Sequence, residues 1–352
     1  MKNMSEYRSI LEKQTPSIVI SGDSLSYNRY SYDPEFRGMD VWCYGPGLPS
    51  WSFQLRDRIY QEDPWFRFGD ELRFSCPVAP GVDEPSQVPF LAAFGGRGVT
   101  LEVGEETEFT VPGNGAQVVL YLQKRPEDGC VLDIWVDGKP TARNVDIRGN
   151  RSVFHGFELV ALNLNGEAGN GHRVSFRNIR GEHPRVTLAG TGSVYRKVAL
   201  TGQGSTCVRF FIENFSQRIA DHSPDLLILI LTANDRIKVA PMGLYGDLQE
   251  LFTRIQESLP ETKVLFLLPP SSHDPEDPGR ETGGYSSLLT IEAYNRITER
   301  ACREFGIESL RTSELFDGDH PELWRMDNIH LNPEGNRILL DAMRSKLGLK
   351  KE

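Results

Sequence analysis

The sequence is poor in cysteine, and no two of its five cysteines stand in the close CxxC spacing of a zinc site. Their number is odd and they are scattered, which argues against the disulfide framework of a small secreted protein. They are Cys43, Cys76, Cys130, Cys207 and Cys302. We therefore expect no structural disulfide, no zinc site and a reducing, cytoplasmic setting.

The chain also lacks a long apolar run and a surplus of positive charge. Its opening residues, MKNMSEYRSILEK, carry charges throughout and contain no apolar stretch of signal-peptide length. The apolar runs, such as residues 226–231, are strand-sized and too short to span a bilayer. Lys and Arg number 39 against 49 Asp and Glu, a net charge of −10, whereas nucleic-acid binding rests on neutralising phosphates. We expect neither a membrane nor a nucleic acid as a partner.

Both ends of the chain alternate strand-like and helix-like segments. Residues 17–21 form a short run of β-branched residues, and residues 50–60 have the spacing of an amphipathic helix. From residue 193 the alternation resumes, with strands expected at residues 194–200, 225–231, 263–268 and 307–310, and helices at residues 206–222, 246–258, 291–305 and 333–347. Near-continuous apolar strands between helices predict an α/β fold, a parallel sheet with helices on both faces.

The middle of the chain has a different pattern. Short strand-like runs, such as residues 117–122 and 131–136, alternate with turn signals such as Asp137-Gly138, and helical periodicity is absent. This pattern favours an all-β sandwich or jelly roll. Because strand 17–21 has no parallel partner before residue 193, we interpret the middle as an insertion. The predicted division is residues 1–65 and 193–352 for the α/β domain and residues 66–192 for the inserted domain.

Polar residues stand at three expected strand ends or helix starts, where a parallel sheet places its ligands. Ser24 follows the first strand, Asn234 follows strand 225–231, and Asp327 and His330 precede the last helix. A serine hydroxyl becomes a good nucleophile when an imidazole takes its proton, and the imidazole needs a carboxylate that fixes its tautomer. The pattern therefore predicts Ser24 as the nucleophile, His330 as the base and Asp327 as its partner, with the amide of Asn234 as an oxyanion donor.

These residues also fall in order on known motifs. Ser24 lies in Gly22-Asp23-Ser24-Leu25, and Asp327 and His330 form a DxxH pair that is followed by LNPEG. The sequence resembles the GDSL/SGNH hydrolases over residues 17–64 and 193–347. That resemblance implies a flavodoxin-like parallel sheet and chemistry without a metal or an organic cofactor.

The resemblance assigns the oxyanion hole to Ser24, Gly204 and Asn234. The sequence departs from the family pattern at two places. Thr232 stands where the GxND block of the family usually has glycine, and Gly202 is an alternative to Gly204 for the glycine block.

The predicted function is hydrolysis of a carboxylic ester through a Ser-His-Asp triad and an acyl-enzyme. Inserted sandwiches occur in carbohydrate and peptidoglycan O-acetylesterases of the family, which favours a short-acyl or O-acetyl ester of a carbohydrate as the substrate. An acyltransferase with an acceptor other than water would use the same residues, and an inactive carbohydrate-binding scaffold is a third interpretation. The inserted domain could instead wall the active-site mouth or form the contact of a homo-oligomer.

Structural roles compete with each of these assignments. Ser24 could cap a turn, and His330 could bond a carbonyl group, although their order with the other motifs favours catalysis. Asp23 is expected to hold the serine turn through backbone hydrogen bonds, and core packing explains most aromatic residues near it, such as Trp51. The fragment Asp317-Gly318-Asp319 lacks the rest of a calcium loop, and the other histidines have no paired ligands at metal spacing.

Overall fold

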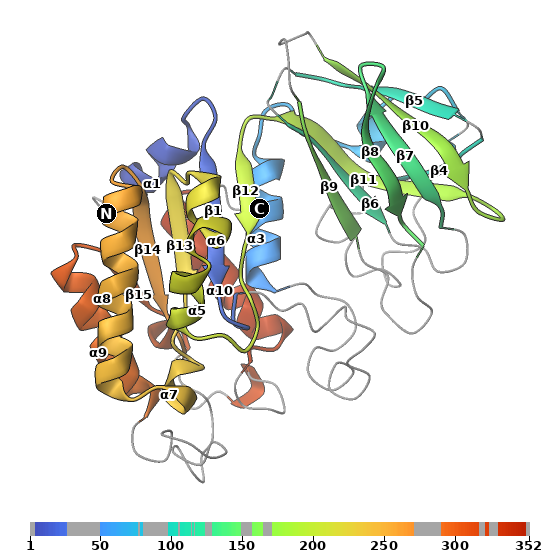
Figure 1. The fold of residues 1–352 in the computed structure, drawn as a ribbon. Coiled ribbons are helices and arrows are strands. Elements are labelled where there is room, and N and C mark those ends of the chain that lie inside the picture. Colours follow the sequence, from blue (N-terminus) through green and yellow to red (C-terminus); the bar gives the residue numbers. More distant parts are fainter. Residues whose placement is uncertain are drawn as a thin grey trace.

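The computed structural model describes most of the chain as two parts that lie side by side (Figure 1). One part contains helices and a parallel sheet, and the other contains antiparallel strands. The described residues are 4–26, 50–76, 78–79, 98–104, 106–113, 115, 117–123, 129–148, 157–164, 171–270, 290–316, 321–323 and 330–349. Within these ranges no helix is both long enough and apolar enough to cross a membrane.

A five-stranded sheet forms the centre of the α/β part. Its strands in spatial order are β12 (Lys197–Leu200), β1 (Ser17–Gly22), β13 (Leu226–Ile230), β14 (Lys263–Leu268) and β15 (Glu308–Arg311). All four pairings are parallel. Counted along the chain the order is 2-1-3-4-5, which is the flavodoxin-like order. The predicted fold class is confirmed, and the order of the strands reverses between β1 and β13, where such sheets bind their ligands.

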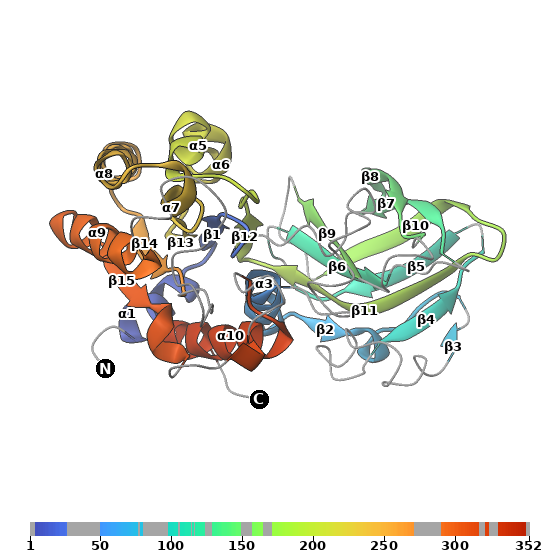
Figure 2. The same ribbon diagram turned by 90° about the horizontal axis from the view of Figure 1, so that it is seen from below.

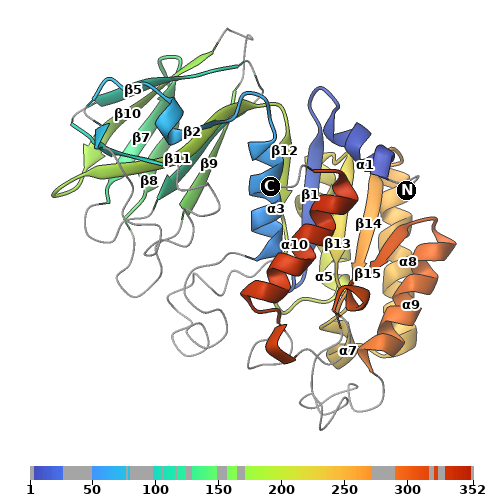
Figure 3. The ribbon, with the colours of Figure 1, turned by 180° about the vertical axis from the view of Figure 1, so that it is seen from behind.

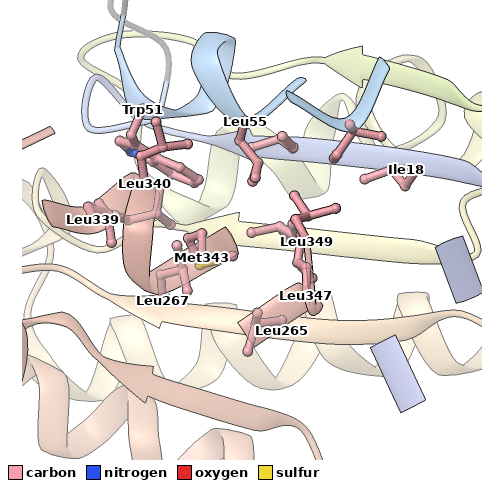
Figure 4. Close-up of a cluster of buried hydrophobic side chains, with 14 of the residues drawn as sticks. Ile18, Trp51, Leu55, Leu265, Leu267, Leu339, Leu340, Met343, Leu347 and Leu349 are labelled. Atoms are coloured by element: carbon pink, nitrogen blue, oxygen red, sulfur yellow. The ribbon is translucent and has the colours of Figure 1, made fainter. Parts of the chain in front are cut away.

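Helices cover both faces of this sheet (Figure 2). One face carries α1 (Met4–Leu11), α3 (Trp51–Gln61) and α10 (Pro333–Leu347), and the other carries α5 (Val208–Glu213), α8 (Pro241–Ser258) and α9 (Ile291–Glu304). Successive side chains of a strand point to opposite faces. Ile18 and Ile20 accordingly enter the core under α3 and α10, while Val19 enters the core under α5 and α8. Figure 4 shows Leu265 and Leu267 in the first core with Met343 and Leu347 of α10.

The helix bounds follow local chemistry. Helix α10 covers the predicted residues; the side chain of Asn332 accepts a hydrogen bond from Gly335 N (3.0 Å), and Gly348 ends the helix with a φ of 67°. Helix α8 begins at Pro241, earlier than predicted, because proline suits the first turn, where its missing N–H costs nothing.

The single helix predicted at residues 206–222 is wrong in its continuity. It is broken into α5, α6 (Phe215–Arg218) and a 3-10 turn, η3 (Ala220–His222). Between α5 and α6, Asn214 Nδ2 donates a hydrogen bond to the carbonyl group of Phe210 (2.8 Å). Such a side chain competes with the helical backbone and favours a break.

The other part consists of two antiparallel sheets. The first contains β3 (Val78–Ala79), β4 (Val99–Glu102), β11 (Arg185–Val194), β6 (Gln117–Gln123) and β9 (Phe157–Asn163), with β2 (Arg67–Phe68) paired to β11. The second contains β5 (Glu106–Val111), β10 (His172–Arg180), β7 (Val131–Val136) and β8 (Lys139–Asp146). Leu120 and Leu122 from the first sheet share a buried core with Leu132 and Ile134 from the second. The predicted domain bounds and the sandwich architecture stay predictions.

Helix α3 lies where the two parts meet, beside β12 and α10 (Figure 3). Its Tyr60 packs in one buried cluster with Val119 and Tyr121 of β6. The hydroxyl group of Tyr121 donates a hydrogen bond to Asp57 of the helix (2.9 Å). The same helix therefore contacts both the antiparallel strands and the core beneath the candidate site.

Candidate active site

Ser24 stands in a tight turn at the carboxyl end of β1. The strand ends at Gly22, whose φ is +152°, and a Cβ atom there would lie 2.0 Å from the carbonyl oxygen of Ile230. Only glycine permits this approach of β1 to β13. Asp23 N then donates to Ile230 O (3.1 Å), and Ser26 N donates to Asp23 O (3.0 Å). The hydroxyl-bearing Ser24, 8% exposed, is thereby held where the order of the strands reverses.

His330 meets this serine from the far end of the chain. Its Nε2 atom lies 2.8 Å from Ser24 Oγ, although the two residues are 306 positions apart. This separation is that of an O–H···N hydrogen bond. When Nε2 carries no proton, the hydroxyl group donates to it, which is the arrangement of a nucleophile and its general base. The structure brings together two of the residues predicted from the sequence, and Asp327 lies outside the described residues.

Asn234 follows β13 and stands on the neighbouring loop. Its Nδ2 atom is buried and has no hydrogen-bond partner among the described residues. Gly202 and Gly204 both lie in the loop after β12, and the N–H between them, that of Gln203, donates to Gly22 O (2.8 Å). The loop of the two glycines is therefore joined to the end of β1, next to the serine turn.

Thr232 occupies the position at which the family pattern predicts glycine. Its φ is +87°, in the left-handed region that favours glycine. Its side chain is fully buried, and in the described part of the chain its Oγ1 atom has no hydrogen-bond partner. The backbone shape expected of a glycine is thus kept here by a β-branched residue.

Two buried carboxyl groups support these loops. Asp23 Oδ1 accepts a hydrogen bond from Leu25 N (2.9 Å), as the sequence predicted for this residue. Asp235 accepts hydrogen bonds from Val208 N at the start of α5 (3.1 and 3.3 Å). The pKa of each carboxyl group is raised to about 7, mainly by burial, and for Asp23 the charge of Asp235 contributes to that rise. Both groups therefore retain a proton at a pH where an exposed aspartate is ionised.

A small pocket of about 290 Å³ opens to solvent beside Ser24 and His330. Its remaining lining is mostly apolar and comes from Leu25, Ser50, Ile230, Pro270, Leu331, Asn336 and Leu339. Within the described ranges no three His, Cys, Asp or Glu side chains gather as metal ligands. The arrangement places a serine hydroxyl group, an imidazole and an apolar recess side by side.

The sequence alone did not single out Asp235 or Asn336 for this site, and it named Trp51 only among several aromatic residues near the nucleophile that core packing mostly explains. A signal for Asp235 was present in the sequence, because it directly follows Asn234, the predicted oxyanion donor, in the block that corresponds to GxND. For Trp51 and Asn336 the residue types gave none, because a tryptophan and an asparagine at helix starts are commonly explained by packing and capping.

Residues 177–338 match the GDSL-like lipase/acylhydrolase family. This range contains Asn234 and His330. Ser24 lies outside the range, but the strand before it, β1, pairs with β13 inside the range. No curated protein matches the chain.

Several solved structures are similar to this chain at low identity. A peptidoglycan O-acetylesterase is 14% identical, with a TM-score of 0.45 and coverage of 98% of this chain and 95% of that chain. An acetylxylan esterase from Geobacillus stearothermophilus is 16% identical, with a TM-score of 0.37 and coverage of 44% and 74%. A lipase/acylhydrolase from Enterococcus faecalis is 14% identical, with a TM-score of 0.37 and coverage of 45% and 80%.

Proposed function

We propose that this chain, whose residues 177–338 match the GDSL-like lipase/acylhydrolase family, is a serine esterase of that family with Ser24 as its nucleophile and His330 as its base. One observation carries the proposal, the 2.8 Å separation of Ser24 Oγ and His330 Nε2 at the reversal point of a parallel sheet. Residues so far apart in sequence meet at hydrogen-bond distance in the place where such sheets bind ligands.

In the proposed reaction Ser24 Oγ attacks the ester carbonyl carbon while His330 Nε2 takes the hydroxyl proton. We assign Asp327 the task of holding the imidazole in the required tautomer. Ser24 N–H, Asn234 Nδ2 and Gly204 N–H are the proposed donors to the tetrahedral oxyanion. His330 then gives its proton to the leaving alcohol, and a water molecule attacks the acyl-enzyme by the same route to release the acid.

The pocket supports a short acyl group in this proposal. The space beside Ser24 and His330, about 290 Å³ with open solvent included, is lined mostly by apolar side chains. Apolar side chains from Ile230, Leu331 and Leu339 would contact the acyl methyl group or a short extension of it. For the alcohol we keep a carbohydrate hydroxyl, as predicted from the sequence.

We also keep the reducing, cytoplasmic setting as part of the proposal. The four cysteines within the described ranges are free rather than paired in disulfides, as expected of a protein that works under reducing conditions.

Turnover of p-nitrophenyl acetate tests the proposal. We expect Ser24→Ala and His330→Ala each to lower kcat by at least about 10³-fold, because nucleophile and base act as a unit. Ser17→Ala, at the opposite end of β1, and His172→Ala, a histidine that pairs with Asp137 on the antiparallel strands, are matched controls and should retain activity. Wild-type activity in folded Ser24→Ala would overturn the proposal.

A further inference from the structure

A tryptophan beneath the site is hydrogen-bonded to the turn that carries the nucleophile. Trp51 is the first residue of α3 and is fully buried. Its indole Nε1–H donates to the carbonyl oxygen of Leu25 (2.8 Å), the residue directly after Ser24. The hydroxyl groups of Ser50 and Ser52 bond the carbonyl oxygen of Ser26, the next residue along. The start of α3 thus directs three side-chain donors to the serine turn.

An asparagine connects the same helix start to the segment that carries the base. The backbone N–H of Trp51 donates to Asn336 Oδ1 (2.9 Å). Asn336 Nδ2 donates in turn to the carbonyl oxygens of Leu331 (2.9 Å) and Asn332 (3.0 Å). Leu331 directly follows His330. Asn336 is 6% exposed, so these bonds lie in the core.

The bond to Asn336 satisfies an N–H group at the start of α3 from outside the helix. The first N–H groups of a helix have no partner within the helix and are usually satisfied by the side chain of the residue before it. Ser50 stands at that position but makes no side-chain capping bond. Asn336, from α10, satisfies the N–H group of Trp51, the first residue of the helix. A residue of the second half of the chain therefore caps a helix of the first half.

These bonds form one continuous path, which we name the bracket: Leu25, Trp51, Asn336 and Leu331. We infer that Trp51 and Asn336 are positioning residues that set the distance between Ser24 Oγ and His330 Nε2. The inference rests on the proposed function. Apolar contacts hold α3 and α10 together, but hydrogen bonds fix direction as well as distance, and a displacement of about 1 Å in a reacting pair can cost about 100-fold in rate.

Replacing Trp51 by phenylalanine removes one link of the bracket. Figure 4 shows the Trp51 ring in the buried cluster with Leu339 and Leu340, and phenylalanine keeps an aromatic ring there. The change removes the donor to Leu25 O. We expect kcat for p-nitrophenyl acetate to fall roughly 10- to 100-fold while KM changes less than about threefold, because proton transfer rather than binding is impaired.

Tyr60→Phe is the matched control on the same helix. Tyr60 is also a fully buried aromatic residue whose polar atom is hydrogen-bonded, since its hydroxyl accepts from Val198 N (3.1 Å). The bracket does not include it. Each variant loses the one hydrogen bond of a buried aromatic side chain, but only Trp51→Phe should lower kcat. Equal kcat values for Trp51→Phe and the wild type, or an equal loss in Tyr60→Phe, would overturn the inference.

Asn336→Leu and the double variant provide a second measurement. Because both residues act on one distance, the double variant should lose less activity than the product of the two single losses. Independent, multiplicative losses would contradict a shared bracket. Ser24→Ala in the same assay separates the proposed function from the positioning role of the bracket. An active Ser24→Ala would contradict the proposed function. An inactive Ser24→Ala together with a fully active Trp51→Phe would contradict the positioning role alone.

Discussion

Thr232 combines a φ of +87° with a buried hydroxyl group that has no partner in the described part of the chain. A left-handed β-branched residue costs roughly 1–3 kcal/mol and persists where its surroundings hold it in place. Thr232 lies two residues before Asn234, the proposed oxyanion donor. We interpret the strain at Thr232 as a consequence of the backbone turn that leads from β13 to Asn234.

Thr232→Gly should therefore cost little stability. Relief of backbone strain and of the unpaired hydroxyl offsets the lost methyl contacts, and we expect the free energy of unfolding to change by less than about 1 kcal/mol. Thr191 is equally buried, but it lies in a strand and its hydroxyl donates to Val119 O (2.7 Å). Thr191→Gly should lower the free energy by about 2–4 kcal/mol. Denaturant unfolding of both variants measures the difference, and equal losses would refute the interpretation.

At the scale of elements, apolar runs predicted most of the α/β part. Strand β14 and helix α10 have the predicted bounds, because a continuous apolar run and a capped amphipathic pattern are local signals. Serine and histidine could likewise be placed at an expected strand end and helix start. The contact of Trp51 with Asn336 could not be predicted, since it depends on how α3 packs beside α10 and on no pattern within either helix.

The loops after β1 and β13 give stability a distinct pH dependence. The pKa of Asp23 is raised from its usual 3.8 to about 7, so the folded protein holds this proton longer than the unfolded chain. Stability should therefore fall as pH rises from about 4 to about 7. In Asp23→Asn the free energy of unfolding should fall by roughly 2–4 kcal/mol less than in the wild type between about pH 4 and about pH 7. Denaturant unfolding at several pH values measures this difference.

Asp133→Asn is the control of opposite sign. Hydrogen bonds from Asn144 N and the Asn178 side chain lower the pKa of Asp133, so its contribution is lost only as pH falls below about 4. This variant should leave the pH dependence of the free energy of unfolding between pH 4 and pH 7 unchanged. A wild-type slope in Asp23→Asn would show that Asp23 does not hold its proton in that window.

At the scale of the whole molecule, the site combines residues that precede the antiparallel strands in sequence, such as Ser24, with residues that follow them, such as Ile230 and His330. The sequence indicated this arrangement because strand 17–21 lacked a parallel partner before residue 193, and β1 indeed pairs with β12 and β13. The way the two parts meet was not predictable. Tyr121 and Asp57 form a hydrogen bond there, and neither residue type signals a partner 64 positions away.

The most direct measurement is the site of covalent modification by a fluorophosphonate, which reacts with an activated serine. Mass spectrometry of the intact wild-type protein after labelling should show one adduct, located on Ser24 by peptide mapping. His330→Ala should slow its formation by at least about 100-fold, because the hydroxyl group then has no base. An adduct on another residue, or unchanged labelling of Ser24 in folded His330→Ala, would contradict the convergence of residues 24 and 330 into one reactive pair.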